Sequence, residues 1–134
     1  MGTTTIEYRL LPGTRAAAGL AGNHSVIADR PEGKLGGRGL GFDGGELLAL
    51  AIGGCFCNDM QAISSEMGLT ISGLRISVSV DFGGSPSRAT DARMTVECTL
   101  ADGGDPSVLI DRAKEITTIG NSLRAGIPVE ISAK

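Results

Sequence analysis

The most constraining feature of the sequence is a long apolar segment, Glu46–Met67, in the middle of the chain. The segment contains no proline, is rich in good helix formers and is followed by a glycine, so it predicts one long helix. Its first half is apolar on almost every side, whereas its second half has a polar face. A helix of about 22 residues extends roughly 33 Å, which is comparable to the diameter of a small domain. The first half therefore needs burial all round, and a partner subunit is one way to supply it.

Short β-type segments precede this helix. Thr3–Leu11 and Thr14–Leu20 flank a proline-glycine turn and predict a hairpin. Asn23–Asp29 has a β-branched centre and ends before an arginine-proline pair, which predicts a third strand. The glycine-rich stretch Pro31–Gly45 has no apolar periodicity, so we expect a surface loop there.

Two strands, a second helix and a last strand are predicted after the long helix. Ser72–Phe82 and Asp91–Leu100 alternate apolar and polar residues, which buries one face of each strand. Asp105–Ile119 starts with a good N-cap residue followed by proline, and it predicts a helix. Ile127–Ile131 is the expected last strand. The sequence thus predicts a single α+β domain over residues 1–134 with the order βββ-α-ββ-α-β.

Charge and cysteine content argue against several classes of protein. The net charge of −3 comes from 12 Lys and Arg against 15 Asp and Glu, and no basic run is interleaved with aromatic residues, so we expect no nucleic-acid partner. The chain starts without a leader pattern, and no uninterrupted apolar run approaches the roughly 18 residues of a bilayer span. We therefore expect no membrane association and a cytoplasmic location. Three cysteines, an odd number, predict reduced thiols rather than a disulfide framework.

The long apolar segment also carries a family motif. The sequence Gly-Gly-Glu-Leu-Leu-Ala-Leu-Ala-Ile-Gly-Gly-Cys-Phe at residues 44–56 resembles the central helix of the OsmC/Ohr superfamily of osmotically induced and organic-hydroperoxide-resistance proteins. Glu46 and Cys55 keep the nine-residue spacing typical of the family. A later stretch that starts at Thr117 resembles the second family motif, but Thr117 occupies the position of its cysteine. The resemblance covers residues 23–131 and implies an OsmC-like fold, with antiparallel sheets around the long central helix.

The resemblance further implies an intertwined homodimer with active sites at the interface. In active members a cysteine attacks the O–O bond of a peroxide, a second cysteine resolves the sulfenic acid, and an arginine and a glutamate tune the first thiol. The attacking species is a thiolate, which a nearby cation favours. Here Cys55 is the candidate peroxidatic thiol and Glu46 is its candidate support. Three arginines are candidates for the cation: Arg15, which we favour, Arg9 and Arg38.

Each candidate residue also has an ordinary structural interpretation. Cys55 could be a small apolar residue in a buried helix, and Glu46 could simply complement the helix dipole. Cys57 lies about 200° around the helix from Cys55, so it is expected to pack rather than to pair with it. Cys98 is expected to fill space on the core face of its strand, with a role as resolving thiol as the lesser alternative. His24, the only histidine, is isolated and is expected at the solvated surface, with no metal site.

A glycine pair, Gly53-Gly54, stands just before Cys55. Each glycine lowers helix stability by roughly 1 kcal/mol, and glycines inside helices often permit close approach of another element. We expect the pair to allow two helices to cross at the dimer interface.

Three functions fit these observations. The first is a one-cysteine reductase of organic hydroperoxides, in which an external thiol replaces the missing cysteine at Thr117 and no cofactor is needed. The second is a non-catalytic dimer that binds a small hydrophobic ligand. The third is a redox sensor whose single thiol, Cys55, is oxidised without turnover.

Overall fold

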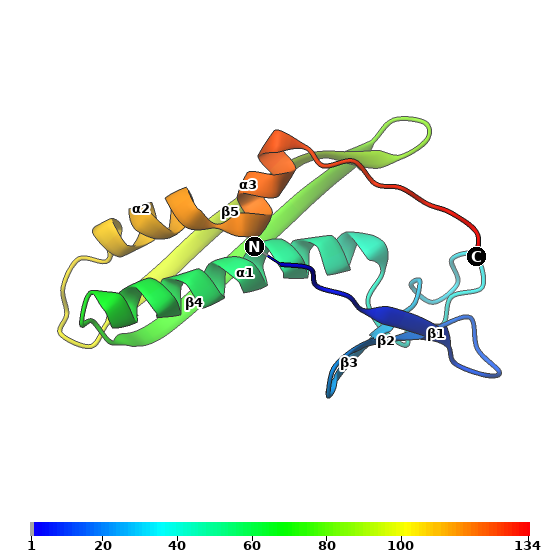
Figure 1. Cartoon of the computed structure of the whole chain (residues 1–134), viewed down its shortest axis with the longest axis horizontal. Coiled ribbons are helices and arrows are strands. Elements are labelled where there is room, and N and C mark those ends of the chain that lie inside the picture. The colour runs from blue at the N-terminus through cyan, green and yellow to red at the C-terminus, as the bar shows by residue number, and fades with distance from the viewer. Residues whose placement is uncertain (1) are drawn as a thin grey trace. The chain divides into compact units, whose positions relative to one another are not determined.

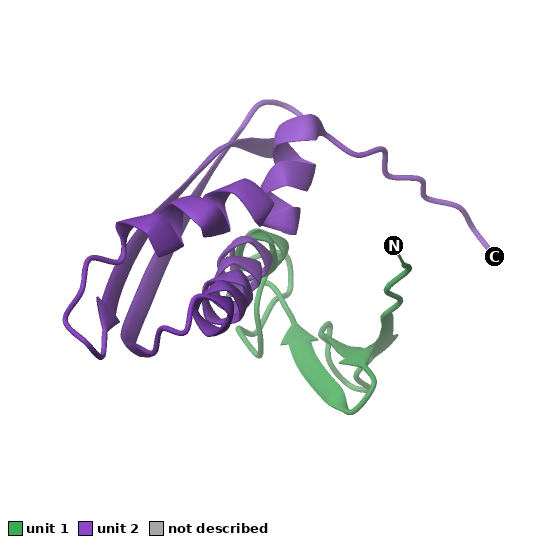
Figure 2. Cartoon of the chain, turned by 60° about the vertical axis from the view of Figure 1, so that its left-hand side comes forward, with its two compact units in different colours: residues 1–48 green, residues 49–134 purple. Residues whose placement is uncertain are grey.

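The structure is a computed structural model that describes residues 2–134 and has an α+β fold (Figure 1). The chain divides into two compact units, residues 1–48 and residues 49–134 (Figure 2). The single domain expected over residues 1–134 stays a prediction. The elements, in chain order, are β1 (Glu7–Leu10), β2 (Ala17–Ala21), β3 (His24–Ala28), α1 (Gly44–Glu66), β4 (Ile71–Gly83), β5 (Arg88–Leu100), α2 (Ser107–Ile116) and α3 (Thr118–Ala125).

The first unit is built on a three-stranded antiparallel sheet in the order β1-β2-β3. The predicted hairpin and third strand are therefore confirmed. Tyr8 lies opposite Gly19 in the register, and a Cβ atom on Gly19 would come within 2.7 Å of the Tyr8 ring. The glycine thus makes room for the one tyrosine of the chain to lie flat across the sheet.

The loop between β3 and α1 is organised by a buried carboxylate. The Asp29 side chain, 8% exposed, accepts backbone N–H hydrogen bonds from Leu40 (3.0 Å), Arg38 (3.1 Å) and Arg30 (2.8 Å). These bonds, that from Leu40 above all, hold the pKa of Asp29 below its usual 3.8 against the opposing effect of desolvation. The predicted surface loop is therefore present, and the Asp29 side chain binds backbone amides nine and eleven residues further along it.

Helix α1 begins two residues earlier than its apolar run predicts. Asp43 Oδ1 accepts a hydrogen bond from the Glu46 N–H (2.8 Å), and Glu46 Oε1 accepts one from the Asp43 N–H (3.1 Å). This reciprocal pair is a capping box, which satisfies two amide groups that the helix leaves free. At the other end Gly68 adopts a φ of 68°, and the Leu69 N–H donates to the Ser64 carbonyl, as in common glycine-terminated helices.

The second unit packs helices on one face of the β4-β5 hairpin, and Figure 2 shows α1 and α2 on the same side of it. The inward residues of the hairpin pair across the strands, Leu74 with Cys98 and Ile76 with Val96, as the alternation predicts. The contacts of this layer define the core cluster. Its buried members are Phe56, Met60, Ile63, Leu100, Leu109 and Ala113.

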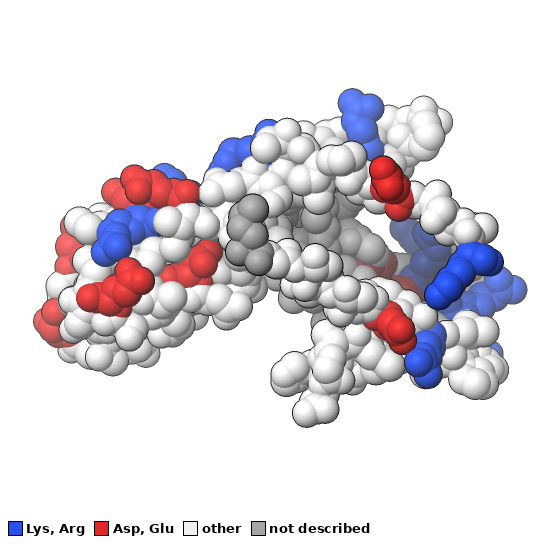
Figure 3. Space-filling view, viewed as in Figure 1, with Lys and Arg blue, Asp and Glu red and all other residues white. Residues whose placement is uncertain are grey.

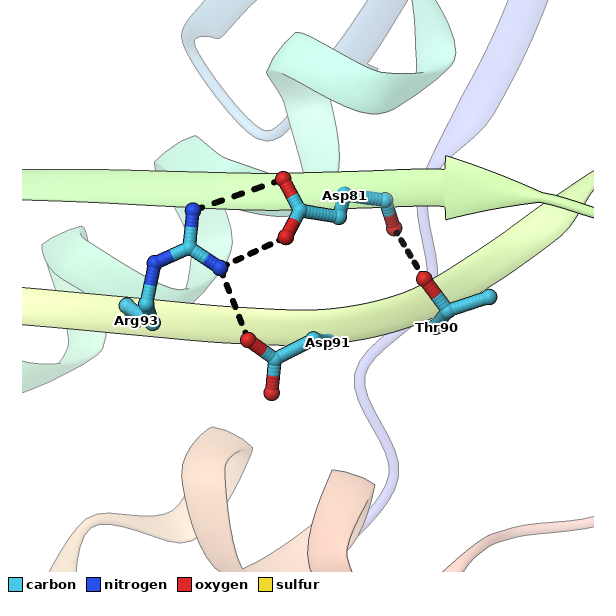
Figure 4. Close-up of polar contacts among 4 residues, drawn as sticks. All are labelled: Asp81, Thr90, Asp91 and Arg93. Atoms are coloured by element: carbon cyan, nitrogen blue, oxygen red, sulfur yellow. Dashed lines mark hydrogen bonds and ion pairs between the residues drawn. The ribbon is translucent and has the colours of Figure 1, made fainter.

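The opposite face of the hairpin is polar. Arg93 donates to Asp81 Oδ2 at 2.6 Å and to Asp91 Oδ2 at 2.8 Å (Figure 4). The hydrogen bond and charge of Arg93 lower the pKa of Asp81. More than half of each of these side chains is exposed, so solvent screens the pairs and their contribution to stability is small. This face is therefore a solvated surface.

The C-terminal region differs from the prediction in two respects. The expected helix over Asp105–Ile119 is broken at Thr117, so α2 ends at Ile116 and α3 follows. The expected strand Ile127–Ile131 is not formed. Its apolar side chains are exposed, with Ile127 at 64%, Val129 at 77% and Ile131 at 94%, because no strand among the described residues lies beside the segment to complete its hydrogen bonds.

Helix α1 is also long and apolar enough, by length and composition alone, to cross a bilayer. The core helix of a soluble protein passes the same test, and α1 supplies Phe56, Met60 and Ile63 to the core cluster. Only 33% of its most apolar stretch is buried within the chain. The helix therefore leaves apolar surface that is not covered by these contacts.

Candidate functional site

Cys55 lies in the middle of α1 and is half-buried, next to the fully buried Phe56. Its sulfur has two polar neighbours. Asp59 Oδ2 is 3.7 Å from Cys55 Sγ and accepts the thiol hydrogen. The Thr117 hydroxyl is 3.8 Å from the same sulfur and donates to it. The three side chains form the candidate site, and all of them belong to residues 49–134.

Thr117 reaches the site because the helix is interrupted there. Its φ of −59° and ψ of 108° are not helical, although its N–H still donates to the Ala113 carbonyl at 3.0 Å. The Thr117 carbonyl accepts from the Asn121 N–H (2.9 Å), while Asn121 Nδ2 donates to the Glu115 carbonyl (3.0 Å). These bonds satisfy the backbone groups at the break. The interruption leaves the Thr117 side chain buried, 5% exposed, with its hydroxyl against Cys55.

Asp59 is a residue of the site that the sequence reasoning missed. It stands four positions after Cys55 on α1, and side chains at this spacing lie on the same face of a helix. That spacing was visible in the sequence and is the signal that would have found it. The sequence can therefore predict that Asp59 lies beside Cys55 on the helix. It cannot predict that Thr117, far away in the chain, contacts the same sulfur.

The Cys55 sulfur takes part in two polar contacts of opposite direction: it donates to the Asp59 carboxylate and accepts from the Thr117 hydroxyl. Asp59 is an acceptor for the thiol hydrogen, and Thr117 is a donor to whatever negative charge develops on the sulfur. The site therefore has a path for the proton to leave Cys55 and a group that stabilises the sulfur afterwards.

Glu46 has a structural role that accounts for both of its polar contacts, namely the capping box with Asp43. Cys55 follows nine residues later, which is roughly 13.5 Å along a helix and about 180° around its axis. The two side chains therefore project from opposite sides of the same helix. The helix geometry therefore does not favour a contact between Glu46 and Cys55 of the same chain.

The three candidate arginines belong to the first unit. Arg9 pairs with Glu7 at 3.2 Å on the exposed surface of β1. The stem of Arg15 runs against the loop, where a Cβ on Gly36 would lie 2.5 Å from its Cδ. Arg38 is exposed, and its backbone N–H contributes to the Asp29 hydrogen bonds. The assignment of one of them to Cys55 stays a prediction.

The other two cysteines are free, and both are half-buried. Cys98 packs against the core cluster from β5, as its place in the alternation predicts, and burial raises the pKa of its thiol. His24 is exposed at the start of β3. Within residues 2–134 no group of three or more His, Cys, Asp and Glu side chains is placed to hold a metal ion.

Gly53 and Gly54 were both expected to allow two helices to cross at a dimer interface, and the structure gives them different surroundings. A Cβ on Gly53 would lie 2.9 Å from Val78 Cγ2, so this glycine lets α1 approach β4 within the same chain. Gly54 is exposed and faces open space. The helix-crossing explanation is therefore wrong for Gly53, because β4 occupies the position at which a second helix would have to pack.

The fold and the site together place the chain in a known class. The chain has a long central helix that bears a cysteine and packs on an antiparallel hairpin. The family model for OsmC-like proteins matches residues 36–132. The protein therefore belongs to the OsmC-like family. No protein in a search of curated sequences matches it.

Solved structures support the same assignment of the fold. The chain superposes on an OsmC-like protein from Mycoplasma pneumoniae with a TM-score of 0.76 and 15% identity, over 92% of this chain and 88% of the other. The organic hydroperoxide resistance protein OsmC of Legionella pneumophila gives 0.64 and 16%, over 92% and 90%. The organic hydroperoxide resistance protein OhrB of Bacillus subtilis gives 0.61 and 19%, over 93% of both chains. At these identities the likeness establishes the fold.

Proposed function

We propose that this protein is a one-cysteine, thiol-dependent reductase of organic hydroperoxides, in which Cys55 is the reacting residue. The observation that carries the proposal is the contact between Thr117 and Cys55: the side chain at the position of the second family cysteine lies 3.8 Å from the first sulfur. This contact supports the proposed assignment of Thr117 to the second motif position, where this chain has a hydroxyl in place of a thiol. The names of the Legionella and Bacillus relatives supply the substrate class, organic hydroperoxides.

The proposed cycle needs an external thiol. Cys55 Sγ attacks one peroxide oxygen, the O–O bond breaks, and the products are a sulfenic acid on Cys55 and an alcohol. One molecule of external thiol then forms a mixed disulfide with Cys55 and releases water. A second molecule of that thiol restores Cys55 and leaves as the disulfide, so the peroxide is reduced and two thiols are oxidised. No step uses a metal or an organic cofactor.

The proposal includes a cytoplasmic homodimer, without a membrane or nucleic-acid partner. Two kinds of uncovered apolar surface support a second copy as the cover. Helix α1 is buried over only 33% of its most apolar stretch, and Leu50 on it is 49% exposed. The segment Ile127–Ile131 alternates exposed apolar side chains and has no strand partner within residues 2–134. Exposed surface of this kind marks an interface in many proteins.

Peroxide consumption with a single-residue control tests the proposal. Reduced protein is mixed with cumene hydroperoxide and an excess of dithiothreitol, and peroxide loss is followed in the wild type, in Cys55→Ser and in Cys98→Ser. We expect turnover in the wild type and in Cys98→Ser and none in Cys55→Ser, because only Cys55 has the site around it. A wild-type rate equal to that of the buffer blank contradicts the proposal.

A second candidate function is binding of a small hydrophobic ligand, which one pocket of the first unit favours. The pocket has a volume of about 290 Å³ and is mostly apolar. Ala21→Trp should fill it and abolish saturable binding of a hydrophobic fluorescent dye, whereas Ala101→Trp in an exposed turn should not. Dye binding that survives Ala21→Trp excludes this pocket as the site. The lining residues are Ile6, Tyr8, Gly19, Leu20, Ala21, His24, Ser25 and Val26.

A further inference from the structure

We propose that Asp59 carries the thiol proton of Cys55 to the leaving oxygen of the hydroperoxide. The inference rests on the proposed function and adds a catalytic residue to it. Asp59 Oδ2 is the acceptor of the Cys55 S–H at 3.7 Å, so it touches the reacting atom directly. Asp59 is half-buried and accepts no other side-chain hydrogen bond among the described residues, which leaves its carboxylate free for the proton.

The reaction requires that one proton changes place. Attack by sulfur on the hydroperoxide forms an S–O bond and breaks the O–O bond, so sulfur is oxidised and the leaving oxygen becomes an alkoxide. The thiol hydrogen must leave the sulfur, and the alkoxide must gain a hydrogen to become an alcohol. Asp59 connects the two events, because its carboxylate first accepts the thiol proton and then donates it to the alkoxide. Asp59 is ionised again at the end of the step, and the atoms and charges balance.

Thr117 supports the same step through its own contact with the sulfur. Its hydroxyl donates to Cys55 Sγ at 3.8 Å and is held in place by the helix break between α2 and α3. Donation to the sulfur stabilises the negative charge that appears when the proton moves to Asp59. Asp59 and Thr117 therefore have different tasks. The carboxylate moves a proton and the hydroxyl stabilises the charged sulfur.

Two reagents that react with Cys55 can distinguish proton transfer by Asp59 from charge stabilisation by Thr117. Iodoacetamide alkylates the thiolate and expels iodide, which needs no proton, whereas a hydroperoxide expels an alkoxide, which does. The rate of each reaction is to be measured in a Cys57→Ala background. Cys55 is then the one cysteine on α1 whose modification is recorded. The ratio of the peroxide rate to the iodoacetamide rate then removes any effect that a variant has on the amount of thiolate.

Asp59→Asn keeps the shape of the side chain and removes its ability to accept and return a proton. We expect the rate ratio to fall on the order of 100-fold in this variant. Asp59→Glu, which retains a carboxylate, should recover part of the ratio. Thr117→Val should lower both rates and leave the ratio unchanged, because it removes the charge-stabilising donor alone. Asp111→Asn, an exposed charge on α2, controls for the change in net charge.

The outcomes distinguish this inference from the function on which it rests. A wild type that consumes peroxide no faster than Cys55→Ser contradicts the proposed function. It also contradicts proton transfer through Asp59, which depends on that function. A wild type that consumes peroxide, with the same rate ratio in Asp59→Asn, contradicts the proton route alone. In that case Asp59 acts on Cys55 only through its charge.

Discussion

The Thr117 hydroxyl donates to the sulfur of Cys55 across 62 positions of sequence, at 3.8 Å. The contact joins the centre of α1 to the break between α2 and α3. The residue in contact with the sulfur is a threonine, and its hydroxyl oxygen cannot form a disulfide with Cys55.

Thr117→Cys should restore a resolving thiol. Because the Thr117 oxygen is already 3.8 Å from Cys55 Sγ, we expect one equivalent of hydroperoxide to produce a disulfide between residues 55 and 117. Peptide mass mapping without reductant checks this bond. Thr118→Cys, at the neighbouring exposed position, should give no such bond. Equal cross-linking in both variants would show that the α2–α3 break does not hold its observed position.

Cys98 should react slowly with thiol reagents in the native protein. Burial raises the pKa of its thiol, so at neutral pH a smaller fraction is the reactive thiolate than in an unperturbed cysteine. Alkylation with iodoacetamide followed by peptide mapping should label Cys98 last in the folded state, and a denaturant should abolish the delay. Rapid labelling of Cys98 in the folded protein contradicts its packing against the core cluster.

Asp29→Asn should flatten the dependence of stability on acid. The pKa of Asp29 is below 3.8 in the folded state, so its contribution to stability is complete above pH 3.8 and is lost as the pH falls through the lower, folded value. The free energy of unfolding, measured by denaturant at about pH 6 and about pH 3, should decrease less in Asp29→Asn than in the wild type. An equal decrease in both proteins would assign the acid sensitivity to other carboxylates.

Phe56→Ala should lower the free energy of unfolding of the second unit by about 3–5 kcal/mol. The Phe56 side chain is 1% exposed and belongs to the core cluster, so its removal leaves a cavity. Val108→Ala, at a position 59% exposed on α2, should change stability by less than about 1 kcal/mol. Denaturant titration followed by circular dichroism measures both. Similar losses in the two variants would contradict the observed core.

A homodimer should sediment at twice 13.6 kDa at micromolar concentration. The expected cover is the apolar surface of α1, so Leu50→Glu should shift the mass toward the monomer. Figure 3 shows acidic and basic side chains close together at the end of the molecule that bears α2 in Figure 1. A wild-type mass near 13.6 kDa would leave that apolar surface without the proposed partner.

The sequence by itself determined the elements whose signals are local. The apolar run and its terminal glycine predicted α1, the alternation in β4 and β5 predicted which residues face the core, and the turn residues predicted the first sheet. The family motif identified Cys55, and the residue four positions on, Asp59, was readable from helix periodicity. Such signals act over a few residues, within the reach of backbone hydrogen bonds and side-chain spacing.

Only the tertiary structure decided what depends on residues far apart in the chain. The contact of Thr117 with Cys55 depends on α2 packing against α1 through Leu109 and Ala113, which no local propensity encodes. Gly53 is required by β4, and Asp29 orders a loop up to eleven residues away. Ile127–Ile131 has the alternation of a strand and remains unpaired, because a strand forms only where another one completes its hydrogen bonds.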